Sequence, residues 1–69
     1  MKGFILTYDI PRELTRIRKK VHRHLITIDA KKLQHSIWKS EKLRDLIDIA
    51  TFIKKSGGSA TILEEKLVF

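Results

Sequence analysis

One carboxylate in this chain stands where it could do chemistry. Asp9 follows the apolar and β-branched run Gly3–Tyr8, and a strongly basic stretch begins just after Pro11. A strand that brings an acidic side chain to its C-terminal end, beside Arg and Lys, can hold a divalent metal next to phosphates. One carboxylate is too few for a two-metal site, but the symmetry of a dimer could supply its twin. The alternative is that Asp9 bonds backbone amides in the turn before Pro11.

The strongest binding signal is the density of positive charge that follows. Between residues 12 and 23 there is one acid, Glu13, and the basic residues are Arg12, Arg16, Arg18, Lys19, Lys20 and Arg23. The formal net charge of the chain is +7 over 69 residues, which favours polyanionic partners. The alternative is a solvated helix face, but such faces usually mix signs. We therefore expect these side chains to contact the phosphates of DNA or RNA.

Several neighbouring residues have both a structural and a chemical interpretation. Tyr8 could stack on a base, although a strand tyrosine more often packs in the core. His22 and His24 are expected to be surface histidines, and Trp38 is expected in the core or in a dimer interface. The chain has no cysteine, so a metal would need oxygen ligands, which suit Mg²⁺ or Mn²⁺.

The elements that must position these residues follow from periodicity. Residues 2–9 alternate as a strand, with apolar side chains on both faces. A helix with Pro11 at its first position is predicted next, and its inward residues are expected to be Leu14, Ile17, Val21 and Leu25. The β-branched residues 26–28 predict the first strand of a hairpin, residues 29–32 its turn, and residues 33–39 its second strand.

A second amphipathic helix and a last strand complete the chain. Ser40 is predicted to cap the helix, and Gly57-Gly58 to end it. Its inward residues are expected to be Leu43, Leu46, Ile47, Ala50 and Ile53. The last strand is predicted over residues 61–69, where the apolar tail Leu67–Phe69 would pair with a neighbouring subunit.

The predicted order βαββαβ is an α+β arrangement. Right-handed crossovers place both helices on one face of an antiparallel sheet, which is the ferredoxin-like fold, here as one domain over residues 1–69. The other sheet face would expose Ile5, together with Trp38 or Ile37 depending on register. Exposed apolar sheet surface and a small core both favour a homodimer.

Membrane insertion is not expected for this sequence. No apolar stretch approaches the ~20 residues that span a bilayer, and no secretory signal is recognisable at the start. We therefore expect a cytoplasmic protein without a membrane partner.

Three segments together resemble a known family. They are Tyr8-Asp9-Ile10-Pro11 at the end of the first strand, the basic helix that follows at once, and Leu33-Gln34-His35-Ser36-Ile37-Trp38. In this order and spacing, over most of the chain, they resemble the small CRISPR-associated adaptation proteins, the ferredoxin-like endoribonuclease or endonuclease subunits that partner the CRISPR integrase.

The resemblance implies an antiviral-defence protein, a homodimer that faces nucleic acid. Two copies of Asp9 would approach each other across the dimer axis and hold Mg²⁺ or Mn²⁺ for phosphodiester cleavage, with Ser36 near the metal. An integrase subunit would be the protein partner. Two alternatives stay open: a non-catalytic DNA-binding adaptor, and a related small toxin-type ribonuclease of the same fold.

Overall fold

The elements of the chain follow the predicted order βαββαβ. The computed structural model describes residues 3–66. The elements are β1 (Phe4–Asp9), α1 (Thr15–Thr27), β2 (Lys31–Gln34), β3 (Ile37–Ser40), α2 (Leu43–Lys55) and β4 (Ser59–Glu64). The predicted pairing of the apolar tail Leu67–Phe69 lies outside the described residues.

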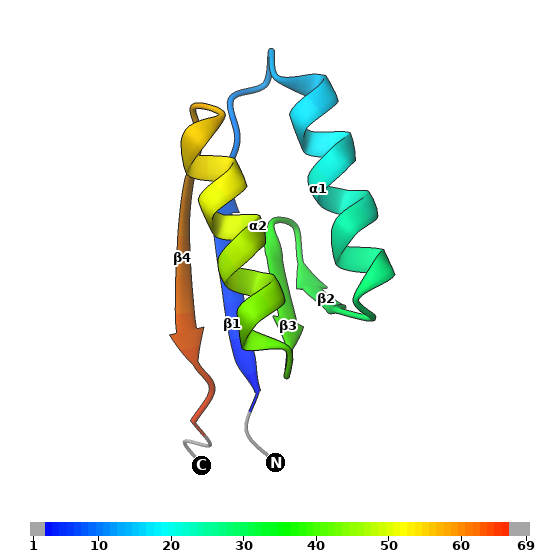
Figure 1. Cartoon of the computed structure of the whole chain (residues 1–69), viewed down its shortest axis with the longest axis vertical. Coiled ribbons are helices and arrows are strands. Elements are labelled where there is room, and N and C mark those ends of the chain that lie inside the picture. Colours follow the sequence, from blue (N-terminus) through cyan, green and yellow to red (C-terminus); the bar gives the residue numbers. More distant parts are fainter. Residues whose placement is uncertain (1–2, 67–69) are drawn as a thin grey trace.

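The four strands form one antiparallel sheet in the order β2-β3-β1-β4. Both helices cover the same face of this sheet (Figure 1). Each helix connects two parallel strands that flank a third, so the units β1-α1-β2 and β3-α2-β4 interleave. This arrangement confirms the predicted ferredoxin-like α+β fold.

Alternation along the strands divides the sheet into a covered face and an open face. Leu6 pairs with Trp38 on β3 and with Ile62 on β4, and its side chain is buried under the helices. Its neighbour Thr7 pairs with Ile37, which is half-buried on the open face. Ile37 rather than Trp38 is therefore the β3 residue that joins Ile5 on the open face.

The core lies between the covered face and the two helices. Its buried residues are Leu6, Ile10, Val21, Leu25, Ile28, Trp38, Leu46, Ile49, Ala50, Ile53 and Ala60. The prediction for α2 was partly wrong, because Leu43 and Ile47 are exposed and Ile49 is buried instead. Apolar side chains cover a wide arc of α2, and the sequence does not show which margin of that arc turns inward.

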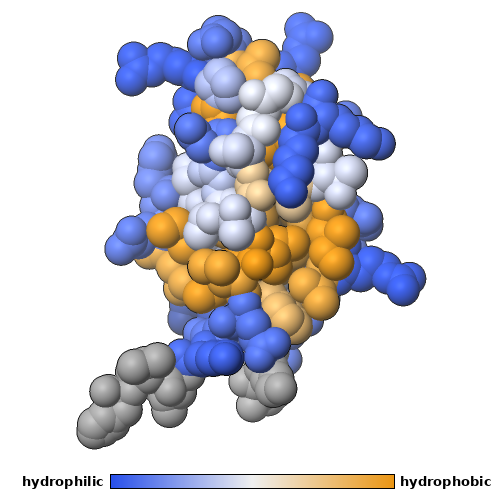
Figure 2. Space-filling view, turned by 90° about the vertical axis from the view of Figure 1, so that its left-hand side faces the viewer, coloured by the Kyte–Doolittle hydropathy of each residue, from blue (hydrophilic) through white to orange (hydrophobic). Residues whose placement is uncertain are grey.

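Exposed apolar residues of α2 and β4 form a band on one side of the molecule. Figure 2 shows this band from the side on which β4 lies in Figure 1. Ile47 is 47% exposed and Leu63 is 50% exposed, and between α2 and β4 runs a groove of about 360 Å³. Such surface favours a second copy of the chain, and the homodimer stays a prediction.

The C-terminus of α1 corrects the predicted hairpin. Residues 26–28 are not a strand: Ile26 and Thr27 form the last turn of α1, and Ile28 is its C-cap. The N–H of Ala30 donates to the Leu25 carbonyl and that of Asp29 to the Ile26 carbonyl, both at 3.0 Å. This is a Schellman motif with Asp29 in the left-handed region at φ 58°. Its hydrogen bonds outweigh the weak helix propensity of β-branched residues.

The hairpin itself is displaced from its predicted position. The predicted turn at residues 29–32 is wrong, because Lys31 and Lys32 already belong to β2. The turn lies at His35 and Ser36, and Ser36 adopts φ 65°. The alternation of residues 33–39 therefore belongs to two strands, and the register shifts between Lys32 and Gln34.

Both helices also begin later than predicted. The Leu14 N–H donates to the Pro11 carbonyl at 3.0 Å, so residues 11–14 form a turn and α1 begins at Thr15. Ser40 ends β3, and its Oγ accepts a hydrogen bond from the Lys42 N–H at 3.0 Å, one residue before α2 begins. The predicted end of α2 is confirmed, with Gly57 at φ 104°.

No helix within residues 3–66 is long and apolar enough to cross a membrane.

Candidate nucleic-acid interface

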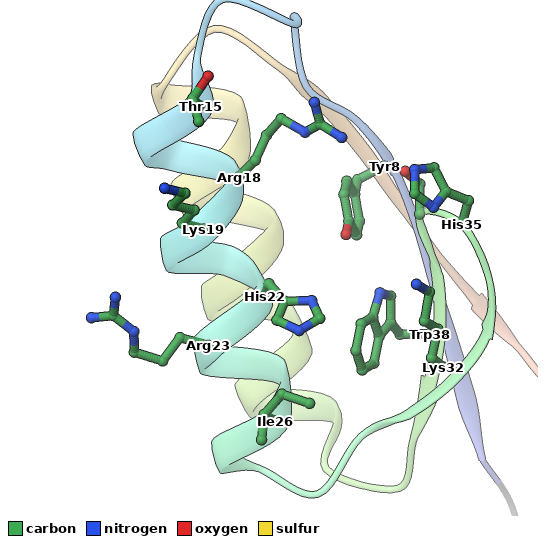
Figure 3. A pocket seen from close by; sticks show the side chains of 11 residues that line it. Tyr8, Thr15, Arg18, Lys19, His22, Arg23, Ile26, Lys32, His35 and Trp38 are labelled. Atoms are coloured by element: carbon green, nitrogen blue, oxygen red, sulfur yellow. The ribbon is translucent and has the colours of Figure 1, made fainter.

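A hollow of about 610 Å³ opens between α1 and the β2–β3 hairpin (Figure 3). It is lined by Tyr8, Thr15, Arg18, Lys19, His22, Arg23, Ile26, Lys32, His35, Ser36 and Trp38. We call this set the basic hollow. Its volume falls within the roughly 300–1,000 Å³ that is usual for ligand sites. Residues along the whole length of α1, the end of β1 and the displaced hairpin together build it.

The charged groups of the basic hollow all have one sign. Four lining residues are Arg or Lys, and none is Asp or Glu. Figure 3 shows the Arg18 side chain extending from α1 towards Tyr8, whereas Lys19 and Arg23 extend away from the hairpin on the outer side of α1. Lys32 lies on the hairpin side, close to Trp38. A polyanion that follows α1 would therefore meet cations on both sides of the opening.

The inner wall of the basic hollow is aromatic. Trp38 is only 2% exposed, and the His22 ring meets it edge-on, with 5.4 Å between centroids and 81° between planes. The Trp38 Nε1 atom is buried and has no hydrogen-bond partner among the described residues. Buried donors are nearly always paired in proteins. This N–H is therefore a hydrogen-bond donor that could still accept a partner from a ligand in the basic hollow.

The geometry of α1 divides the predicted basic cluster. Arg18, Lys19 and Arg23 line the basic hollow from two adjacent rows of the helix, Arg18 in one row with Thr15 and His22, and Lys19 and Arg23 in the next row with Ile26. Arg16 and Lys20 are exposed on the rest of the surface, and the Lys20 Nζ lies 5.2 Å from the centroid of the Phe52 ring on α2. Arg12 is exposed in the turn before α1.

Asp9 lies on the other face of the sheet from the basic hollow. It is the last residue of β1 and pairs with Ser59, and alternation places it on the open face with Ile5 and Thr7. Its side chain is exposed. Its carboxylate makes no hydrogen bond or ion pair with any described residue, so the alternative role as a turn cap gains no support. No group of three His, Asp or Glu that could hold a metal occurs within residues 3–66.

The two secondary candidates, Tyr8 and Ser36, both line the basic hollow. The Tyr8 N–H donates to the Ser36 carbonyl at 3.2 Å, which connects β1 to the hairpin turn. The left-handed conformation of Ser36 holds this turn. Both residues therefore lie with the cations on the covered side and not with Asp9 on the open face.

Four further lining residues were not proposed as site residues from the sequence: Thr15, Ile26, Lys32 and His35. Thr15 and Ile26 lie in the same two rows of α1 as Arg18 and Arg23, so reading α1 in steps of three and four residues would have found them. Lys32 and His35 lie in the hairpin. They were missed because the turn was predicted at residues 29–32 and lies at residues 35–36.

Comparison with known proteins gives no relative for this chain. No protein-family model matches it, and neither a curated protein nor a solved structure matches it. Its function therefore has to be inferred from the geometry of the chain itself.

Proposed function

We propose that this chain binds nucleic acid through the basic hollow, including the residues of α1 that line it. The observation that carries the proposal is the set of four cations around one opening without a carboxylate among the lining residues. Arg guanidinium groups bind phosphate oxygens through two parallel donors, and Lys contributes a point charge. Contacts of this kind fix the backbone of DNA or RNA without reading its sequence.

The length of α1 suits this role. Its 13 residues extend over about 20 Å at ~1.5 Å per residue, which is enough to follow several phosphates of a strand. The aromatic side chains of the inner wall carry none of the positive charge on which this phosphate binding depends. The backbone of a duplex or of a single strand would bind here with little sequence preference.

The dependence of affinity on salt tests this function. If each of the four cations contacts one phosphate, log K against log[salt] has a slope near −3.6 for a DNA duplex. The affinity then falls about 150-fold between 50 and 200 mM salt. Fluorescence anisotropy with a labelled duplex and a labelled single strand measures both slopes. A slope near zero would contradict phosphate binding.

A second candidate function is metal-dependent cleavage of the bound phosphodiester backbone, and the observation that favours it is the exposed Asp9 carboxylate, which bonds to no other side chain within residues 3–66. Asp9 is exposed on the open face with Ile5 and Thr7, and a second copy whose two-fold axis passes near the end of β1 would bring a second Asp9 near. Two such carboxylates are oxygen ligands of the kind that suit Mg²⁺ or Mn²⁺. A metal held there would supply an activated water and charge stabilisation. Without cleavage, the same dimer is the DNA-binding adaptor, with an integrase subunit as its proposed partner.

The Asp9→Asn variant separates the enzyme from the adaptor. We expect cleavage of labelled DNA or RNA in Mg²⁺ or Mn²⁺ by the wild type, and a loss of about 100-fold or more in the variant, because the amide removes the ligand charge. Binding at low salt should stay within about twofold, since the Asp9 side chain lies on the opposite face of the sheet from the basic hollow. Cleavage that is equal in both proteins, or absent from both, would contradict the nuclease and leave the adaptor.

A further inference from the structure

The basic hollow carries side chains that phosphate binding does not require. Aromatic or imidazole side chains reach it from three elements: Tyr8 from β1, His22 from α1 and His35 from the hairpin turn. His22 and His35 are exposed and Tyr8 is half-buried, so their rings are available to a ligand. Ile26 adds an exposed apolar side chain, 54% accessible, on the same side of α1. A planar apolar group would find contacts here that a phosphate would not use.

The unpaired Trp38 N–H is an independent observation on the same wall. The Trp38 side chain lines the basic hollow although it is almost fully buried, and Figure 3 shows the nitrogen-bearing edge of its indole ring turned towards Tyr8. A buried donor without a partner is costly, and binding of an acceptor removes that cost. The acceptor would have to enter between Tyr8 and His22. Ring nitrogens and carbonyl oxygens of nucleobases are acceptors of this kind.

We propose that the basic hollow binds a single nucleotide unit, with its base between Tyr8 and His22 and its phosphate at Arg18 and Lys32. This inference rests on the proposed nucleic-acid binding and names the part of the polymer that the hollow recognises. A base inside a duplex is stacked and cannot enter, so the unit comes from an unpaired strand or end, or it is a free mononucleotide. Sites for single strands combine cations with aromatic side chains in this way.

The intrinsic fluorescence of Trp38 measures occupancy directly, because Trp38 is the only tryptophan of the chain. Titration with AMP should give a saturable change in emission. AMP should bind at least about fivefold more tightly than adenosine or inorganic phosphate, which each offer half of the contacts. An unpaired oligonucleotide that displaces AMP better than a blunt duplex identifies a strand as the source. If AMP binds and neither polymer displaces it, a free mononucleotide is the source.

Two variants and one control decide the outcome. Arg18→Ala should weaken AMP binding at least about fivefold, whereas Arg16→Ala, which removes an equal charge outside the basic hollow, should change it less than twofold. Ile26→Ala should weaken AMP but not inorganic phosphate. If AMP binds no better than phosphate, or if Arg16→Ala weakens it as much as Arg18→Ala, the nucleotide site is overturned. Salt-sensitive binding of the duplex in that same sample would leave the proposed function intact.

Discussion

Reversing the charge of Arg18 and Arg23 together should weaken the binding of a labelled duplex by about 100-fold or more at low salt. Each substitution removes a charge-assisted hydrogen bond and places a carboxylate beside the phosphates. The slope of log K against log[salt] should also become shallower by about 1.8, or about 0.9 for each phosphate that the variant no longer neutralises. Both side chains are exposed, so the far-ultraviolet circular dichroism of Arg18→Glu/Arg23→Glu should match that of the wild type.

The double variant Arg12→Glu/Arg16→Glu is the matched control. It changes the net charge of the chain by the same amount, from +7 to +3, but neither residue lines the basic hollow. Loss of long-range attraction alone should weaken binding by about tenfold or less and leave most of the salt slope. Equal losses in the two double variants would mean that the net charge of the chain binds nucleic acid without a defined interface.

The difference between Arg18/Arg23 and Arg12/Arg16 shows which parts of the site could be predicted from the sequence. The composition identified the basic segment, and the helical period predicted Leu14, Val21 and Leu25 on the inner face of the helix. The sequence could not show that the hairpin closes over one stripe of this helix. That depends on where β2 begins, and the register of β2 depends on the Schellman motif at Asp29. Gly is the usual residue at this position, so an Asp gave little local signal.

The architecture was more predictable than the element boundaries. Alternation in β1 and the helical period of α2 are long patterns with many residues in agreement, and they gave the order βαββαβ. Boundaries depend on a few hydrogen bonds, such as the turn from Pro11 to Leu14 that delays α1. Ile5 was expected on the open face, but the sequence did not show whether Trp38 or Ile37 of β3 lies on that face as well. The pairing of Thr7 with Ile37 shows that it is Ile37. Asp9 and the basic residues are adjacent in sequence, but alternation in β1 sends Asp9 to the opposite side of the sheet.

Truncating Leu6 should leave the protein close to the midpoint of unfolding at 25 °C. Leu6 is fully buried in the central strand, where it faces Trp38 and Ile62 across the two neighbouring strands. Leu→Ala substitutions at such sites cost about 2.7–5.0 kcal/mol, because the side chains around the cavity relax only partly. A domain of this size has a net stability of roughly 3–5 kcal/mol. Urea denaturation followed by Trp38 fluorescence should therefore show no native baseline, or only a short one, for Leu6→Ala.

Ile5→Ala is the control for this experiment, and it also tests whether the open face is a dimer interface. Ile5 is the adjacent residue of the same strand, but it is half-buried on the open face, so its truncation should cost the single chain only about 1 kcal/mol. If a second copy covers the open face, Ile5→Ala also weakens association, and its cost then increases with protein concentration. A cost that is small at every concentration would exclude the open face as the dimer interface. A cost as large as that of Leu6→Ala in the dilute protein would contradict the division of the sheet into covered and open faces.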